Sequence, residues 1–72
     1  METDTSLAVQ VNGEPRRVAG GSTIAEMLQE LGLDRRKVAV EHNLAIVPRS
    51  DLDRITVEVG DTFEIVHFVG GG

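Results

Sequence analysis

The stretch TIAEMLQELG at positions 23–32 decides the fold class, because it is the segment with the repeat of an amphipathic helix. Thr23 and Glu26 have the spacing of a capping box, so a helix is expected to begin there. Gly32 is expected to end it as a left-handed cap. The apolar side chains recur at spacings of three and four, which places them on one helix face: Ile24, Met27, Leu28 and Leu31.

The residues before the helix predict a β-hairpin. Apolar residues alternate with polar or small ones along positions 7–11, which is the period of a half-buried strand. Asn12-Gly13 predicts a tight turn, because both residues tolerate positive φ. A second strand is expected from about Pro15 to Val18, at the edge of the sheet, since proline has no N–H to donate there.

Beyond the helix the sequence predicts short extended segments separated by turns. The extended segments are expected at 38–41, 44–47, 55–59 and 63–69. The turn or stop signals between them are His42-Asn43, Pro48, the residues 50–53 and Gly60-Asp61. This order predicts an α+β domain in which a mixed, four- to five-stranded sheet packs on one main helix.

Composition limits the class of protein. The chain has 72 residues, no cysteine, and 12 acidic against 7 basic side chains, which gives a net charge of -5. That length fits one small domain, and the lack of cysteine excludes disulfides, cysteine-based metal sites and thiol nucleophiles. The charge has the wrong sign for binding nucleic acid or anionic membranes. No membrane span or signal peptide is visible, so a cytoplasmic location is expected.

The last expected strand divides its side chains between two faces. Phe63, Ile65 and His67 share one face, and Glu64, Val66 and Phe68 share the other. One helix can cover only one face, so if Phe63 and Ile65 pack on it, then Val66 and Phe68 stay exposed. Adjacent exposed apolar side chains indicate a surface for a partner. A covering loop or a fully buried central strand are the alternatives.

The printed sequence ends on Gly70-Gly71-Gly72, directly after this strand. Glycine has no side chain to obstruct a narrow cleft, so Val69 to Gly72 are expected to form a tail that enters another protein's active site. A frayed terminus without a role is the alternative. Residues 1–6 and 68–72 are expected to be flexible.

The remaining titratable residues predict no site of their own. His42, in an expected polar turn, and His67, on the last strand, have no cysteine or second histidine nearby in sequence to complete a metal site, so structural roles are expected. Arg49 is interpreted as a solvated charge. Several acidic residues in the C-terminal half form either a solvated surface or an attraction for a basic partner: Asp51, Asp53, Glu58, Asp61 and Glu64.

Taken together, these features resemble the ThiS family, the sulfur carrier proteins of thiamine biosynthesis. The resemblance runs from about Leu7 to Gly72, and its most specific parts are the segment IVPR at 46–49 and the ending EIVHFVGGG at 64–72. It implies the ubiquitin-like β-grasp fold and a single domain over 1–72. The leading residues and the third terminal glycine are mild departures from the family pattern.

The resemblance also implies that the chain is a cosubstrate and not an enzyme. A ThiF-like, E1-type enzyme would adenylate the Gly72 carboxyl with ATP, and sulfur from a donor such as a cysteine desulfurase would replace AMP. The resulting thiocarboxylate would pass its sulfur to a ThiG-like thiazole synthase. Val66 and Phe68 would contact these partners, and no metal or bound cofactor is implied.

Two other functions share the expected fold. One is the small-subunit sulfur carrier of molybdopterin synthase, which also ends in Gly-Gly. Members of that family are usually longer and often have prolines ahead of the tail, whereas the prolines here are Pro15 and Pro48. The other is a β-grasp interaction module that carries nothing.

Overall fold

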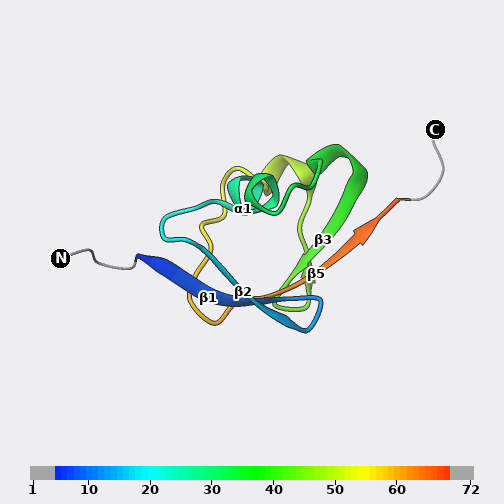
Figure 1. Cartoon of the computed structure of the whole chain (residues 1–72). Helices are drawn as coiled ribbons and strands as arrows, with labels where there is room; N and C mark the ends of the chain where they lie inside the picture. Colours follow the sequence, from blue (N-terminus) through cyan, green and yellow to red (C-terminus); the bar gives the residue numbers. More distant parts are fainter. Residues whose placement is uncertain (1–4, 69–72) are drawn as a thin grey trace.

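Within the described part of the chain, five strands form one mixed sheet, and one α-helix covers one of its faces (Figure 1). The computed structural model describes residues 5–68. Its elements in chain order are β1 (Ser6–Val11), β2 (Glu14–Ala19), α1 (Ile24–Glu30), the 3-10 turn η1 (Arg35–Lys37), β3 (Val38–His42), β4 (Ala45–Ile46), the 3-10 turn η2 (Arg49–Asp51) and β5 (Thr62–His67). The spatial order is β2-β1-β5-β3-β4. The β1–β5 pair is parallel and the others are antiparallel, so the predicted α+β class with a mixed sheet is confirmed.

The hairpin forms as the sequence predicts. Asn12 and Gly13 both have positive φ, 52° and 81°, which lets a tight turn connect two strands of right-handed twist. β2 lies at the sheet edge, and Pro15 pairs there with Gln10. The missing N–H of Pro15 therefore costs no hydrogen bond of the ladder.

Helix α1 has both of the expected ends. The Thr23 hydroxyl accepts a bond from the Glu26 amide, and the Glu26 carboxylate accepts one from the Thr23 amide. Gly32 has φ of 76°, and its amide donates to the Gln29 carbonyl. The Leu33 amide donates to the Leu28 carbonyl, which completes a Schellman motif. The helix is thus bounded at both ends by local hydrogen bonds.

The core lies between α1 and the covered face of the sheet. Ile24, Met27 and Leu28 of the helix are fully buried, and Leu31 is partly buried against them. Leu52 and Val57 close the side of this core. The loop that carries Leu52 and Val57 therefore covers the part of the core that the seven-residue helix is too short to reach.

The predicted extended segment at 55–59 is not a strand of the sheet. It forms one isolated bridge, between Thr56 and Thr23. The Ile55 carbonyl accepts from the Ile24 amide, and the Val57 amide donates to the Ser22 carbonyl. The segment thus runs beside the start of the helix, where Val57 is buried in the core and Ile55 packs partly against it, while Val59 is exposed.

The second turn lies one residue later than expected. His42 is the last residue of β3, and Asn43 and Leu44 form the turn with φ of 50° and 73°. The predicted position of His42 in a polar turn is therefore wrong. The reason is a tertiary contact, because the imidazole of His42 stacks on the Phe63 ring with centroids 5.0 Å apart.

The predicted flexible ends fall largely beyond the described residues. Ser6, placed in the leader, already belongs to β1 and pairs with Ala19. At the other end, the Phe68 amide donates to the Lys37 carbonyl over 2.9 Å. Residues 1–4 and 69–72 lie outside the described part of the chain. Within that part, no helix is long and apolar enough to span a bilayer.

Candidate functional site

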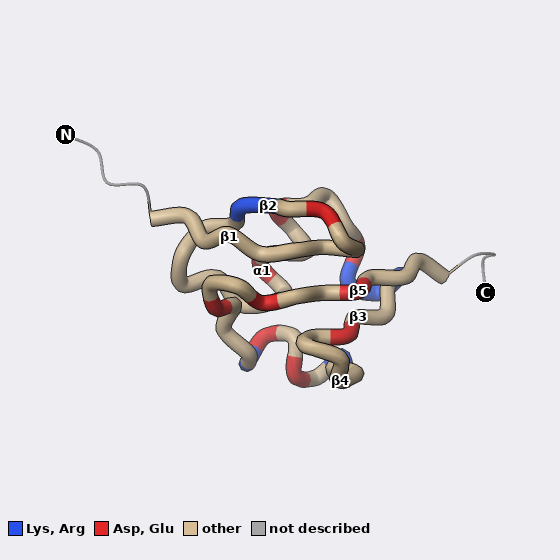
Figure 2. The backbone as a smooth tube through the Cα atoms, turned by 90° about the horizontal axis from the view of Figure 1, so that it is seen from below, with Lys and Arg blue, Asp and Glu red and all other residues tan. Residues whose placement is uncertain are grey.

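The side chains of β5 divide between the two sheet faces as predicted. Phe63 is 1% exposed and Ile65 6% exposed on the face that α1 covers. Val66 and Phe68 are 61% and 56% exposed, and neither a loop nor the helix covers them. Figure 2 views the molecule from this uncovered side, which we call the outer face. Two exposed apolar side chains therefore stand directly before the predicted tail.

Val66 belongs to a shallow apolar hollow on the outer face. The hollow has a volume of about 140 Å³ and is lined by residues of β3, β4 and β5: Ala39, Val40, Glu41, Ile46, Glu64 and Val66. Ala39 lies opposite Val66 in the β3–β5 register. Because alanine is small, the larger side chains Ile46 and Val66 on either side leave a depression above it. The hollow has the size to receive one apolar side chain.

Phe68 is held at the end of this surface by two contacts. Its amide bonds to Lys37, and the guanidinium carbon of Arg49 lies 5.6 Å from the centroid of its ring. That distance is typical of a cation–π contact. The interpretation of Arg49 as a solvated charge without a role missed this contact, because only the tertiary structure brings η2 beside the end of β5.

Asp61 is not part of a solvated acidic surface, which was one of the two interpretations of the acidic C-terminal half. It is 7% exposed, and its carboxylate accepts bonds from the Glu58 amide and the Asn43 amide group. Its Oδ2 lies 2.8 Å from Nε2 of His42. Burial alone would raise the pKa of Asp61, but the hydrogen bonds from Glu58, His42 and Asn43 outweigh it and hold this pKa below its ordinary value. The carboxylate therefore fastens the β3–β4 turn to the start of β5.

Asp53 also has a specific partner. Its carboxylate forms a two-pronged ion pair with the guanidinium of Arg35, at 3.0 Å for one N–O pair and 2.6 Å for the other. The hydrogen bond from Arg35 lowers the pKa of Asp53 and raises that of Arg35 itself. This pair ties η1 to the loop after η2. Among residues 5–68 there is no cluster of three or more potential metal ligands.

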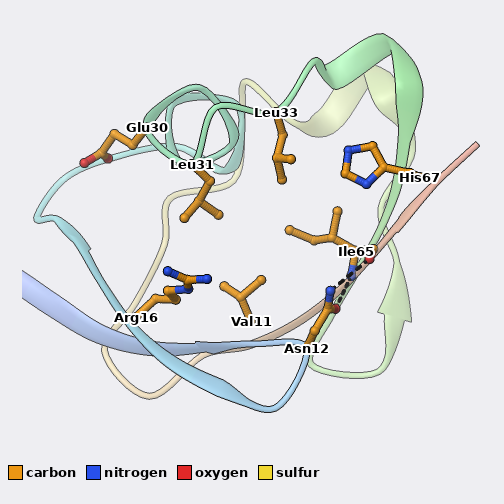
Figure 3. A pocket seen from close by; sticks show the side chains of 8 residues that line it. All are labelled: Val11, Asn12, Arg16, Glu30, Leu31, Leu33, Ile65 and His67. Atoms are coloured by element: carbon orange, nitrogen blue, oxygen red, sulfur yellow. Dashed lines mark hydrogen bonds between the residues drawn. The ribbon is translucent and has the colours of Figure 1, made fainter.

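A larger hollow lies on the opposite side of the sheet, at the end of the helix (Figure 3). It has a volume of about 360 Å³ and is lined by Val11, Asn12, Arg16, Glu30, Leu31, Leu33, Ile65 and His67. Its apolar walls come from the end of α1 and from the sheet, while Arg16, Glu30 and His67 stand at the polar rim. The hollow exists because the helix ends before it covers β1 and β5 completely.

The polar groups inside this larger hollow are already used. The Asn12 amide group bonds to both backbone groups of Ile65, at 2.7 Å to its nitrogen and 3.1 Å to its oxygen. Asn12 thus extends the pairing of β1 with β5 into the turn. No buried side-chain nitrogen or oxygen of the described residues lacks a hydrogen bond. The hollow therefore offers no free buried group to orient a ligand, and the outer face is the better candidate site.

The structure describes two of the six predicted site residues, and the role of these two in binding a partner stays a prediction. Val66 and Phe68 are exposed two positions apart at the end of β5, as expected for a contact surface. Val69, Gly70, Gly71 and Gly72 lie outside the described residues. Their role as a tail stays a prediction. The additional residues that the structure brings to this surface are Ala39, Glu41, Ile46 and Arg49.

Comparison with known proteins agrees with the resemblance and the fold. The ThiS family model matches residues 9–72. The sulfur carrier protein ThiS of Bacillus subtilis is 38% identical over 50 residues, which are 69% of this chain and 76% of that protein. A crystal structure of the thiamine biosynthesis protein ThiS of Geobacter metallireducens superposes with a TM-score of 0.78 at 35% identity, covering 92% of this chain and 100% of that one. The predicted ubiquitin-like β-grasp fold is confirmed.

Two longer proteins also match. The thiazole synthase of Paramagnetospirillum magneticum is 52% identical over 66 residues, and that of Magnetococcus marinus is 39% identical over 66 residues. Each match covers 92% of this chain. The chain spans only 20% of the length of either protein. Both proteins therefore contain a segment similar to nearly the whole of this chain.

Proposed function

Because the chain belongs to the ThiS family, we propose that it carries sulfur, as a thiocarboxylate on Gly72, for the formation of the thiazole of thiamine. The observation that carries this proposal is the family match, which runs through the glycine ending to residue 72. The names of the similar proteins support thiamine over molybdopterin as the pathway. The outer face, whose exposed residues Val66 and Phe68 directly precede the tail in the sequence, is what a carrier needs to dock on its enzymes.

The proposed reaction begins at a poor electrophile. An E1-type enzyme transfers AMP from ATP to the Gly72 carboxylate and releases pyrophosphate, which makes the carbonyl carbon reactive. The outer sulfur of a persulfide on a donor such as a cysteine desulfurase then attacks this carbon, and AMP leaves, which gives an acyl disulfide. A thiol of the partner enzymes attacks the donor-side sulfur of that disulfide, so the thiocarboxylate is released and a disulfide forms between the thiol and the donor. The partner enzymes use ATP and the sulfur donor, and the chain itself binds no cofactor.

In this reaction the chain is a cosubstrate, and its contribution is positioning. Holding a reactive group at the correct place converts a bimolecular encounter into an intramolecular step, which can supply a large part of the rate. The five residues from Phe68 to Gly72 span at most about 16–18 Å when extended. A partner that docks on Val66 and Phe68 can therefore receive Gly72 in an active site that lies up to about 16–18 Å from the docking surface.

Thiazole synthase is the proposed acceptor of the sulfur. Two proteins of that name contain a segment similar to this chain. Joining two proteins that work together raises the effective concentration of one for the other without any new contact. The separate chain would need its own docking surface instead, and the outer face is the candidate for it.

The test is the intact mass of the protein after incubation with ATP, an E1-type activating enzyme and a sulfur donor. One terminal oxygen should be exchanged for sulfur. A matched variant with one leucine appended after Gly72 should fold normally but not be loaded, because its glycine carboxyl is now an amide. An unchanged mass with an enzyme set shown to be active on another carrier would contradict the proposal.

A further inference from the structure

Two glutamates face each other across β3 and β5 on the outer face. Glu41 lies opposite Glu64 in the register, next to the inward pair Val40 and Ile65. Since side chains alternate along strands, the glutamates point to the side away from the helix. Figure 2 shows acidic segments on these two neighbouring strands. Like charges placed directly opposite each other in a sheet are destabilising.

No side chain among the described residues neutralises this pair through a salt bridge. The arginines with ion pairs among residues 5–68 are bound to other carboxylates, since Arg16 pairs with Glu14, Arg35 with Asp53 and Arg36 with Asp34. In that range no salt bridge reaches Glu41 or Glu64. Both glutamates also line the apolar hollow formed with Val66. An apolar depression is thus bordered by two uncompensated negative charges.

The opposite end of the same surface carries a positive charge. Glu64, Val66 and Phe68 follow one another at alternate positions, and a strand rises about 3.3 Å per residue. Arg49 lies over the ring of Phe68. The order along the strand is therefore acidic, apolar and basic over roughly 13 Å. Such a sequence of charges selects the direction in which a partner can lie, because the reversed arrangement would meet like charges.

We propose that the outer face binds a partner protein that inserts an arginine or lysine between Glu41 and Glu64 and an adjacent apolar side chain into the hollow. This inference rests on the proposed carrier function and names the chemistry of the partner's contact. Arginine fits best, because its planar guanidinium can donate to two carboxylates at once. The partner presents a neutral or acidic group at the Phe68 end, where Arg49 would repel a cation.

A second copy of this chain is the alternative occupant. A two-fold axis near Val66 would bring Glu64 of one copy close to Arg49 of the other. Each copy, however, carries a net charge of -5, so two copies repel each other overall. A basic partner gains from that same net charge.

The experiment compares Glu41→Gln, Glu64→Gln and the double variant with Glu58→Gln, an exposed glutamate away from the hollow that makes the same change in net charge. Dissociation constants for thiazole synthase and for the activating enzyme are measured by calorimetry at low and high salt. The double variant should bind about tenfold more weakly at low salt and depend less on salt. Glu58→Gln should bind like the natural sequence.

Thermal unfolding of the same variants separates binding from folding. Removal of the repulsion should leave the melting temperature of Glu64→Gln equal or slightly higher. Glu64→Lys should raise it further, through attraction to Glu41, while weakening the binding more than Glu64→Gln does. Stability and affinity thus move in opposite directions, which a merely structural role of the glutamates would not produce.

Three outcomes would overturn the inference. If the glutamate variants bind as tightly as Glu58→Gln, the cation contact is wrong while the carrier function stands. If the chain forms a dimer in sedimentation that Glu64→Gln dissociates, the occupant is a second copy. The last outcome combines two results. If an active enzyme set leaves the intact mass of the unaltered chain unchanged, and the chain also binds neither enzyme, the proposed function fails and this inference fails with it.

Discussion

The two faces of the sheet differ in how their apolar side chains are completed. On the covered face, Phe63 and Ile65 meet the helix and are buried. On the outer face, Val66 of the same strand and Phe68, which directly follows the strand, stay more than half exposed. Neighbouring side chains of one chain segment thus have different surroundings: one set is buried in the core, and the other is left exposed for the proposed contact with a partner. All four side chains are apolar, so apolar character does not separate them. What decides whether such a side chain is buried is whether it stands at an odd or an even position along this segment, because that sets the face to which it points.

Phe63→Ala should break the covered face and produce the largest effect. The ring is 1% exposed and stacks on His42, so its removal leaves a cavity in a small core. Such a truncation typically costs about 3–5 kcal/mol. Since a domain has only about 5–15 kcal/mol in total, most of the stability should be lost. Chemical unfolding measures the loss in the free energy of unfolding. A loss below about 1 kcal/mol would show that the core can close around the cavity.

Phe68→Ala should affect the outer face in the opposite way. The fold should lose little stability, because the ring is 56% exposed. Affinity for thiazole synthase or for the activating enzyme should fall roughly thirtyfold or more, which corresponds to about 2 kcal/mol for a buried interface aromatic. Val59→Ala, a change of an apolar residue that is 69% exposed and does not line the hollow, is the control. A large loss of melting temperature with unchanged affinity would place Phe68 in the core.

Asn12→Gly tests the connection that holds β5 in place for both faces. Glycine keeps the positive φ of the turn but removes the two bonds to Ile65. The loss of these bonds should cost about 1–2 kcal/mol in the free energy of unfolding. Asn12→Asp keeps an acceptor for the Ile65 amide and should lose less. If the two variants unfold alike, the bond from the Ile65 amide contributes nothing measurable.

The smallest effect is expected in the pH dependence of stability. The pKa of Asp61 is lowered in the folded state, so the unfolded chain binds a proton there first as the pH falls. The stabilisation is therefore complete well above an ordinary aspartate pKa of about 3.9, and it is lost as the pH falls through that value towards the lower folded pKa. Asp61→Asn should flatten this part of the curve of unfolding free energy against pH. An equally steep acid loss in this variant would show that other carboxylates cause it.

Much of the fold follows from short-range patterns that the sequence displays directly. The capping box of Thr23 and Glu26, the cap at Gly32 and the turn at Asn12-Gly13 involve residues within a few positions of each other. The alternation along β5 likewise predicts which side chains share a face, and it correctly placed Val66 and Phe68 on the exposed one. These features depend on backbone preferences and on side chains next to each other in the chain, so they need no knowledge of the rest of the molecule.

The contacts that distinguish the candidate site depend on pairing between distant segments. The opposition of Glu41 and Glu64 requires the register of β3 against β5, and the contact of Arg49 with Phe68 requires the position of η2. The burial of Asp61 with His42 has the same origin. A shift of one residue in register would send every one of these strand side chains to the other face. The sequence by itself determined the hairpin, the helix with its caps and the alternation of side chains in β5. Only the packing of the core, which sets the register, decided that the segment 55–59 stays outside the sheet and which charges meet on the outer face.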